Sequence, residues 1–523
     1  MDFLSSLATS VIQWGALLFA FLLLVALICV GIMYWVDTHQ TTQTIRRNYP
    51  VVGRFRYMFE HMGEFFRQYF FAMDREERPF DRAERSWAYR AAKKVDTTIA
   101  FGSTRSLETP GDIFFLNCAF PTLEEDAAQP KEVCIGQYTA KTPYRTSSVV
   151  NISGMSFGAL SKPAVQALSK GASKAGIWLN TGEGGLSPYH LEGGCDLVFQ
   201  IGTAKYGVRN HEGKLDDEKL AGIAAHENVR MFEIKMSQGA KPGKGGMLPG
   251  AKVTEEISHT RGIPVGQDSN SPNGHTDIKS IDDLLDMVHR VRQVTSKPVG
   301  FKMVVGDMSF FKIMCELIHK KGIDYCPDFI TIDSSDGGTG AAPQPLMDYV
   351  GMHLRESLPL VVNTITSYGL RRYIKVIASG KLIVPGKAAW ALSAGADFVV
   401  SARGFLFSLG CIQALQCNKN TCPTGITTHN TDLQRGLVAV EKAERVANYA
   451  AELLHGIGMI AHSCGVKEPR ELNRSHVRII ENQSRSQVFA ESNPIPDVQT
   501  EYINMVGFQG KASVTEDRLQ SLN

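Results

Sequence analysis

The chain has 523 residues, of which 43% are hydrophobic and 21% are charged. It is longer than a usual single domain but suits a barrel of roughly 250 residues with extensions. Its 55 basic and 53 acidic residues give a formal net charge of +2, so the totals show neither the basic footprint of a nucleic-acid-binding protein nor an acidic tail.

The first predicted element is an apolar segment, residues 14–36, within an N-terminal region 1–40. The segment carries no charged residue and reaches the length of about 20 residues that a bilayer core requires. A cleaved signal peptide would need a basic start and a shorter apolar run, and a buried core helix is seldom free of charge for so long. Arginines 46, 47, 54 and 56 follow the segment, so the positive-inside rule predicts a single-pass anchor in the cytoplasmic membrane with the rest of the chain in the cytoplasm.

Residues 41–147 form a predicted juxtamembrane and pre-barrel region. Between residues 49 and 89 aromatic residues mix with arginines, as in RFRYMFEHMGEFFRQYFF. This pattern fits either a basic amphipathic helix on the membrane surface or a helix packed on the main domain. From residue 109 to 145 turn residues and prolines recur, which predicts irregular structure leading into the next domain.

Residues 148–430 alternate β-rich runs with helical patterns, which is typical of βα units around a parallel sheet. Eight strands are predicted, at 148–153, 177–181, 197–201, 231–236, 299–304, 329–333, 375–379 and 398–401. Helices are predicted at 162–174, 216–226, 281–294, 309–321, 346–368 and 385–394, with long Gly-rich loops after the second and fourth strands. Eight units indicate an α/β fold of the (β/α)8 TIM barrel type; a doubly wound sheet is the alternative, but its GxGxxG signal is absent after the first strand.

The active site of such a barrel lies at the C-terminal ends of the strands, and there the chain is polar and rich in glycine. Met155 and Ser156 follow the first strand between glycines, which let backbone amides approach a ring or an anion closely. Glu183 follows the second strand in TGEGG, where the alternative is a simple tight turn. Lys235 and Lys302 lie on strands four and five, and each should meet either an anionic ligand or reduced flavin, or an acid in an ion pair.

Three later strand ends supply hydroxyls, backbone amides and glycines. The run after strand six is DSSDGGTG, residues 333–340, and strands seven and eight end in Ser379-Gly380-Lys381 and in Ser401-Ala402-Arg403-Gly404. Barrels commonly bind phosphate with the last two of these loops, so a phosphate-bearing cofactor is expected. No nicotinamide fingerprint accompanies them.

The strongest local pattern is CIQALQCNKNTCP, which places Cys411, Cys417 and Cys422 close together before a proline. Three thiolates in a chain too long to need disulfides favour an iron–sulfur cluster that lacks one iron, in a reducing compartment. Structural zinc usually takes four ligands in CxxC-type pairs, and no second pair occurs. Unrelated buried cysteines are the remaining alternative, and Cys195 is a conceivable fourth ligand. The other six thiols fit small core residues.

The combination of SGMSFGALS (153–161), NTGEGG (180–185), KMSQGAKPGKGGMLPG (235–250), DGGTGAAP (336–343) and the cysteine run resembles the FMN-binding synthase domain of glutamate synthases. The resemblance covers residues 148 to 429. It implies a barrel carrying FMN and a 3Fe-4S cluster on the three cysteines, where reduced flavin delivers hydride to the 2-iminoglutarate formed from 2-oxoglutarate and ammonia.

The resemblance also implies roles for single residues. It places FMN against Met155, Ser156, Lys235, Ser379, Gly380, Ala402, Arg403 and Gly404. It places the oxo acid against Lys302, Asp336, Gly337 and Gly338, and it makes Glu183, Lys235 and Lys302 the catalytic residues.

Parts of the family pattern are missing from this chain. It starts MDFLSS and leads directly into the apolar segment, so we expect no glutamine-hydrolysing domain, and ammonia that is free or supplied by a partner. Residues 431–523 are expected to form a helical extension, too short for a reductase domain. Segment 266–277 differs from the proline- and histidine-rich loop of the family, which leaves the substrate open.

Three functions therefore follow as hypotheses. The first is a membrane-anchored enzyme that makes glutamate with electrons from a reductase subunit, a ferredoxin or a quinone-linked protein. The second is an electron-transfer subunit of a membrane complex, and the third is an FMN-dependent amino- or hydroxy-acid oxidoreductase. Nucleic acid is not expected as a partner.

Overall fold

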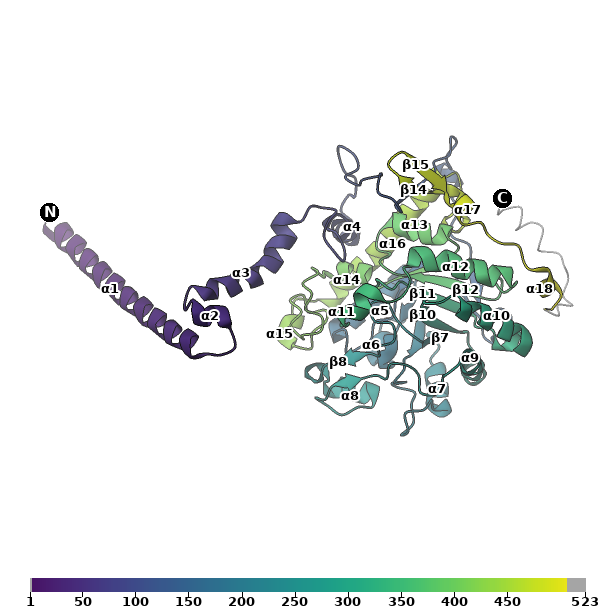
Figure 1. Ribbon diagram of the computed structural model, residues 1–523, viewed down its shortest axis with the longest axis horizontal. Helices are drawn as coiled ribbons and strands as arrows, with labels where there is room; N and C mark the ends of the chain where they lie inside the picture. Colours follow the sequence, from purple (N-terminus) through teal and green to yellow (C-terminus); the bar gives the residue numbers. More distant parts are fainter. Residues whose placement is uncertain (1, 506–523) are drawn as a thin grey trace. The chain divides into compact units, whose positions relative to one another are not determined.

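The computed structural model describes residues 2–505. The chain divides into two compact units between Arg82 and Ala83, and each unit is described by itself (Figure 1).

The first unit consists of helices. They are α1 (Asp2–His39), α2 (Thr44–Asn48), α3 (Gly53–Phe66) and a π-helical turn, η1 (Arg67–Phe71). The predicted apolar segment lies inside α1. Between Thr9 and His39 this helix is long and apolar enough to cross a membrane, and none of its most apolar stretch is buried inside the structure. Within the first unit this stretch is therefore not a buried core helix.

The second unit is built on a closed barrel of eight parallel strands, which confirms the (β/α)8 fold and excludes a doubly wound sheet. In chain order the strands are β4 (Val150–Ile152), β5 (Leu179–Asn180), β6 (Leu197–Ile201), β7 (Val229–Lys235), β10 (Val299–Val304), β11 (Phe329–Asp333), β12 (Lys375–Ser379) and β13 (Phe398–Ser401). All eight predicted strands are present, and five have the predicted bounds. Each pairs in parallel with its neighbours, and β13 closes the barrel on β4.

Helices surround the barrel (Figure 1). They include α5 (Lys162–Ala175), α7 (Asp217–Ala224), α9 (Ile281–Thr295), α10 (Ser309–Lys321), α12 (Leu354–Ser367), α13 (Pro385–Ser393) and α14 (Arg403–Leu409). The predicted helix 346–368 is wrong in one respect, because two helices occupy that span: α11 (Gln344–Tyr349) and α12. They are separated at Gly351, whose φ of 95° does not fit a helix.

The long loops after β5 and β7 are present and contain only short elements. After β5 come a 3-10 turn (Gly182–Gly184) and α6 (Pro188–Leu191). After β7 come β8 (Met247–Leu248), α8 (Glu255–Arg261) and β9 (Ser269–Asn270), and β8 pairs with β9. Both loops follow the C-terminal ends of their strands, so they lie on the side of the barrel where the site is expected.

The opposite end of the barrel is closed by a hairpin. Its strands are β2 (Val133–Ile135) and β3 (Tyr144–Thr146). Ile135 and Tyr144 belong to a buried cluster with Trp178, Phe329 and Phe398, residues at or just before the starts of β5, β11 and β13. The hairpin therefore covers the N-terminal ends of the strands.

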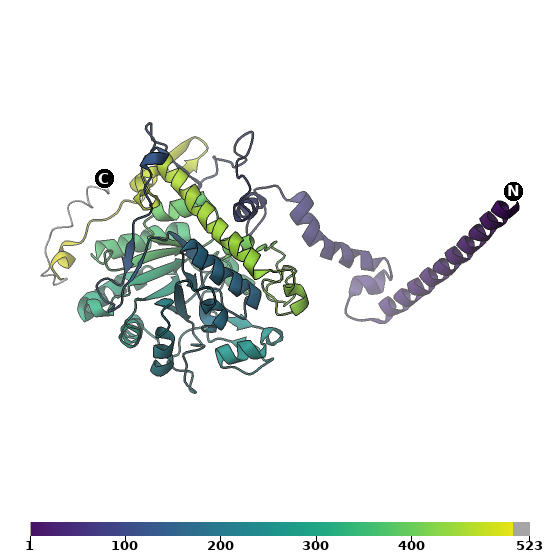
Figure 2. The ribbon, with the colours of Figure 1, turned by 180° about the vertical axis from the view of Figure 1, so that it is seen from behind.

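The C-terminal extension is only partly helical. Its long helix α16 (Ala439–Ser463) packs on α5, α13 and α14, and Figure 2 shows it lying beside α5. Unexpected strands β14 (Val477–Asn482) and β15 (Arg485–Val488) form an antiparallel sheet with β1 (Ile113–Phe115). The remaining helices are α4 (Arg82–Ala92), α15 (Thr431–Gln434), α17 (Phe489–Ser492) and α18 (Thr500–Met505).

Candidate active site

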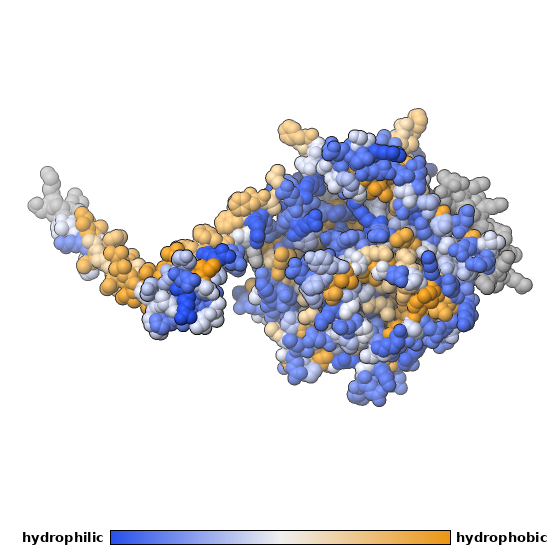
Figure 3. All heavy atoms as spheres, viewed as in Figure 1, coloured by the Kyte–Doolittle hydropathy of each residue, from blue (hydrophilic) through white to orange (hydrophobic). Residues whose placement is uncertain are grey.

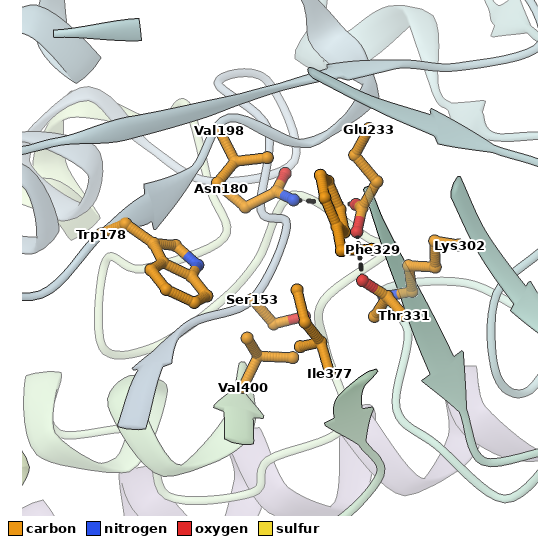
Figure 4. Close-up of a pocket in the computed structure, with 10 residues that line it drawn as sticks. All are labelled: Ser153, Trp178, Asn180, Val198, Glu233, Lys302, Phe329, Thr331, Ile377 and Val400. Carbon is orange, nitrogen blue, oxygen red and sulfur yellow. Dashed lines mark hydrogen bonds between the residues drawn. The ribbon is translucent and has the colours of Figure 1, made fainter. Parts of the chain in front are cut away.

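A buried polar network fills the inside of the barrel. Glu233, on β7, accepts hydrogen bonds from Asn180 Nδ2 at 2.8 Å, Gln200 Nε2 at 2.7 Å and Thr331 Oγ1 at 2.6 Å. These side chains come from four different strands or strand ends, and several of them line the small cavity drawn in Figure 4. The cavity holds little more than a water molecule, so a flavin or an oxo acid must bind outside it. The sequence analysis did not identify Glu233.

Lys302 lines the same cavity and forms an ion pair (Figure 4). Its Nζ lies 3.1 Å from Asp333 Oδ2. Burial alone would lower the pKa of Lys302, but Asp333 and Glu233 outweigh it and raise the pKa. Asp333 is held in turn by Ser379 Oγ at 2.8 Å and by the Gly239 amide at 2.9 Å. Lys302 thus has the acidic partner that the sequence analysis had named as the alternative to an anionic ligand.

Glu183 and Lys235 meet above the strands. Glu183 Oε1 lies 2.8 Å from Lys235 Nζ, and Lys235 also donates to Gln238. The glutamate is tightly enclosed, because a Cβ at Gly202 would lie 2.5 Å from Glu183 Cβ and one at Gly246 would lie 2.5 Å from Glu183 Oε1. Both positions therefore require glycine.

Two further buried cations surround this pair. Burial would raise the pKa of Glu183, but the charges of Lys235, Lys241 and Arg261 together lower it. Burial lowers the pKa of Lys241 to about 8, with Lys235 contributing in the same direction, and burial also lowers the pKa of Arg261.

Lys241 and Arg261 have no carboxylate within 4 Å in residues 2–505, where such contacts are described. Arg261 instead donates to Ser156 Oγ at 3.2 Å and to the Phe157 carbonyl at 3.3 Å, and its buried Nε has no partner in that part of the chain. Three cations thus share one carboxylate. A buried excess of positive charge is costly unless an anion joins it, so this arrangement favours the binding of an anion.

The loops predicted to contact the flavin come together beside Glu183. A Cβ at Gly182 would lie 2.6 Å from the Ser156 amide, and one at Gly184 would lie 2.7 Å from Ser156 Cβ. Met155 and Ser156 are buried. The structure therefore joins the first two strand-end motifs, as their positions had predicted.

The last three strand-end loops also contact one another. Lys381 Nζ lies 2.9 Å from Asp336 Oδ2, so the predicted substrate residue Asp336 already has a cationic partner. Arg403 donates through Nη2 to the Thr339 carbonyl at 2.5 Å, and a Cβ at Gly338 would lie 2.8 Å from Arg403 Nε. Gly404, next along the chain, packs against the Tyr449 hydroxyl of α16.

The three cysteines follow α14 in one loop. Cys422 is buried, and Cys411 and Cys417 are half-buried. Burial raises the pKa of Cys411, and the Cys417 and Cys422 thiols act on it in the same direction. Burial would also raise the pKa of Cys422, but hydrogen bonds with Thr424 and Thr427 lower it overall.

Neighbouring side chains hold this cysteine loop in place. Arg403 Nη1 lies 3.8 Å from Cys417 Sγ, the buried Lys252 donates to the Cys417 carbonyl at 3.0 Å, and the Tyr89 hydroxyl donates to the Cys411 carbonyl at 2.6 Å. Among the described residues no group of three or more His, Cys, Asp or Glu side chains is arranged to hold a single metal ion. Cys195 precedes β6, at the opposite end of the barrel from this loop, and contacts Ser169, so the structure does not support it as a fourth ligand.

His275 is a further polar group that the sequence analysis did not single out. It is buried, and its Nε2 lies 3.0 Å from the Lys235 carbonyl. Because a carbonyl only accepts, Nε2 carries the proton and Nδ1 is a bare acceptor. Burial, aided by Lys205, lowers the pKa of His275 to about 4, and Nδ1 has no partner within the described chain.

The comparisons with known proteins agree on one family. A model described as a conserved region in glutamate synthase matches residues 115–467. The chain belongs to the glutamate synthase family. The matched residues run from the end of β1 to just beyond α16. They therefore include part of the C-terminal extension, residues 431–523, which the sequence analysis had placed outside the barrel domain.

Individual members of the glutamate synthase family match over different lengths. The glutamate synthase large subunit-like protein YerD of Bacillus subtilis (strain 168) is 38% identical over 501 residues, which cover 88% of this chain and 95% of that protein. An archaeal-type glutamate synthase (NADPH) of Thermotoga maritima is 35% identical over 333 residues, and the archaeal glutamate synthase (NADPH) of Methanocaldococcus jannaschii is 34% identical over 339. Each alignment covers 63% of this chain and 62% of the relative.

Among solved structures, the chain is similar to an (S)-mandelate dehydrogenase at 14% sequence identity. The match covers 76% of this chain and 91% of that protein, with a TM-score of 0.44. This similarity is too low to bear on the ligand.

Proposed function

We propose that the chain is an oxidoreductase that forms L-glutamate from 2-oxoglutarate and ammonia through 2-iminoglutarate, with FMN and a 3Fe-4S cluster as cofactors. The single observation that carries this proposal is the buried excess of positive charge around Glu183. Family membership supports the reaction class, and the charges support the substrate.

The cations suit a dicarboxylate. 2-Oxoglutarate carries two carboxylates, and the two cations without an acidic partner, Lys241 and Arg261, offer one charged contact to each. Arginine and lysine bind carboxylates through charge-assisted hydrogen bonds, which are the stronger kind. The contribution of Lys302 and of Asp336-Gly337-Gly338 to substrate binding remains a prediction. Lys302 already pairs with Asp333, and Asp336 already pairs with Lys381.

Ammonia would bind between two acceptors. Glu183 is kept ionised by its neighbours, and His275 offers a bare Nδ1. Both can accept hydrogen bonds from a nitrogen, and Glu183 can take the proton that the nitrogen loses as its bond to the oxo carbon forms. Lys235, held by Glu183, can donate to the oxygen that leaves as water.

Two sets of residues support the two proposed cofactors. Glycines at 182, 338 and 380 let these strand-end loops pack closely on Ser156, Arg403 and Ser334. FMN would be held by Met155, Ser156, Lys235, Ser379-Gly380 and Ala402-Arg403-Gly404. Three thiols in one loop, with the pKa of Cys422 lowered and Arg403 beside Cys417, suit a cluster on Cys411, Cys417 and Cys422. When bound, FMN supplies hydride chemistry and the cluster supplies one-electron transfer.

The partners and location are also part of the proposal. Electrons would come from a reductase subunit, a ferredoxin or a quinone-linked protein. Helix α1 would cross the cytoplasmic membrane once, in contact with lipid, and the arginines that follow it would keep the rest of the chain on the cytoplasmic side.

The test is glutamate formation by purified protein supplied with a reductant, 2-oxoglutarate and ammonium. Lys241→Ala should raise the KM for 2-oxoglutarate by roughly 10-fold or more, since a charged hydrogen bond contributes about 1.5–3 kcal/mol. Lys244→Ala, an exposed lysine in the same loop, is the matched control and should leave KM unchanged. If the wild-type protein aminates neither 2-oxoglutarate nor any other oxo acid, the proposal is wrong.

A further inference from the structure

The end of α1 is joined to the next two helices by a buried ionic cluster. The Asp37 side chain has no exposed surface, and its carboxylate pairs with Arg46 at 2.5 Å and with Arg54 at 2.8 Å. The Val51 amide donates to the same carboxylate at 3.0 Å. One acid thus holds residues from α2, from α3 and from the turn between them.

Two backbone features show that this joint has a defined geometry. Val51 has a φ of 68°, which is unfavourable for a β-branched residue and needs compensating contacts such as the Asp37 bond. A Cβ at Gly53 would lie 2.8 Å from the Ile45 carbonyl, so α3 can start this close to α2 only with glycine. The direction in which α3 leaves α1 is therefore set by specific contacts.

The helix held by this joint carries an apolar stripe. Phe55, Phe59, Met62, Phe66 and Phe70 recur at three- and four-residue intervals, so they share one face of α3 and η1. The Phe55 and Phe59 rings lie 6.5 Å apart, and the Phe66 and Phe70 rings 5.4 Å.

The stripe is exposed within its unit. Phe55 is 53% exposed, Phe59 60% and Phe70 74%. Figure 3 shows hydrophobic atoms at the surface along α1 and along part of α3. An exposed apolar patch of this kind marks an interaction surface.

The charge of the segment indicates which surface it contacts. Residues 44–71 contain five arginines and two glutamates, and Arg56 and Arg67 lie beside the stripe on one side of the helix. An amphipathic helix with aromatic residues on one side and arginines beside them is typical of a helix lying in the plane of a bilayer interface. The joint also connects the helix that carries the stripe to α1, the segment proposed to cross the membrane.

We propose that α3 and η1 lie in the headgroup layer of an anionic membrane, with the stripe facing the acyl chains and the Asp37 cluster setting their orientation. This inference rests on the proposed membrane crossing by α1, but not on the reaction. The helix would then be a second attachment to lipid, which limits the freedom of the chain beyond it.

The test uses the full chain reconstituted in lipid nanodiscs of phosphatidylcholine and phosphatidylglycerol. A fluorescent amino acid is placed at Phe59, on the stripe, at Glu60 as the matched position off the stripe, and at Phe21 inside α1. Quenching by bromine atoms attached near the headgroups should be roughly threefold stronger at Phe59 than at Glu60, as an apolar face about 5–10 Å deep requires. Deeply placed bromine should quench Phe21.

Other outcomes would overturn the inference. Equal, weak quenching at Phe59 and Glu60 with normal quenching at Phe21 would mean that α3 leaves the membrane. Protection of Phe59 from both bromine and aqueous iodide would mean that the stripe packs on protein. Absent quenching at Phe21 would mean that α1 does not cross. None of these readings involves catalysis, so they leave the proposed reaction untouched.

A second variant tests the joint separately. Asp37→Asn keeps the size of the side chain and removes its charge. We expect quenching at Phe59 to fall by at least half while quenching at Phe21 stays the same. Unchanged quenching at Phe59 would show that the cluster does not orient the helix.

Discussion

At the scale of single residues, the candidate site is distinguished by which cations have a carboxylate partner. Lys302 and Lys381 are paired with Asp333 and Asp336. Lys241 and Arg261 are buried without such a partner in the described chain. A bound dicarboxylate would neutralise the charges of Lys241 and Arg261. Because the pKa of Lys241 is lowered to about 8, the binding of that dicarboxylate should depend on pH.

Substrate affinity should therefore fall as pH rises. The pKa of Lys241 is lowered to about 8 by burial, so its charge is present below that pH and lost above it. We expect the KM for 2-oxoglutarate to rise between pH 7 and pH 9, by roughly tenfold if the charge is required. Lys241→Arg should keep its charge over this range and flatten the profile. Identical profiles for the two proteins would show that Lys241 is not the titrating group.

Arg403 gives a prediction about the proposed cluster. Its Nη1 lies 3.8 Å from Cys417 Sγ, and hydrogen bonds to sulfur are one of the factors that set cluster potentials. Arg403→Lys should lower the midpoint potential by on the order of 50 mV, the equivalent of about 1 kcal/mol. A redox titration followed by EPR measures this. Arg435→Lys, at an exposed site, should leave the potential unchanged, and an equal shift in both variants would contradict the assignment.

The candidate site could be predicted only in part from the sequence. Glu183, Met155 and Ser156 were identifiable because they follow strands in a fold whose strand ends form the site, and they do come together. Lys241 and Arg261 were not identified, because their importance depends on having no acidic partner, which only three-dimensional structure reveals. The signal that could have found Lys241 is a lysine in a Gly-rich loop after a barrel strand with no acid beside it.

At the scale of elements, the strands were predictable and the interruptions were not. The runs at 299–304, 329–333 and 398–401 are short, apolar and rich in β-branched residues, and buried strands of a parallel barrel need little more. Residues 346–368 were predicted as one helix from their pattern, yet the backbone of Gly351 separates α11 from α12. Strands β14 and β15 were missed because their half-exposed sequences carry charged residues.

The packing of α16 on α5 depends on one glycine. A Cβ at Gly171 would lie 2.5 Å from the Val446 side chain and 2.8 Å from the Ala443 carbonyl. Gly171→Ala should therefore lower the free energy of unfolding by about 1–3 kcal/mol through overpacking.

The control for this substitution is Gly222→Ala in α7. A Cβ at Gly222 would meet no atom within 4 Å, so alanine should stabilise the helix by up to about 1 kcal/mol. Denaturant unfolding of both variants measures the difference. Equal stability of the two variants would show that α16 does not pack closely on the barrel.

At the scale of the whole molecule, the two units differ in how much apolar surface they bury. The second unit has a closed barrel and its own helices, whereas α1 in the first unit buries none of its most apolar stretch. A compact unit with its own core is expected to remain folded when the connection is cut.

A protease site inserted between Glu76 and Glu77 tests this independence. After cleavage, the second unit should leave the membrane, keep its thermal unfolding midpoint to within about 2 °C and retain glutamate formation with a soluble artificial reductant. Aggregation of the released unit, or loss of activity with that reductant, would show that the two units form one folded structure.

The hairpin of β2 and β3 determines the route by which substrate and product of the proposed reaction reach and leave the site. Because Ile135 and Tyr144 close one end of the barrel, all small molecules must arrive and depart through the other. Glutamate has the same two carboxylates as 2-oxoglutarate, so it would occupy the same cations on its way out. Product leaving and substrate entering thus share one passage, and glutamate should inhibit the enzyme by competing directly with the oxo acid.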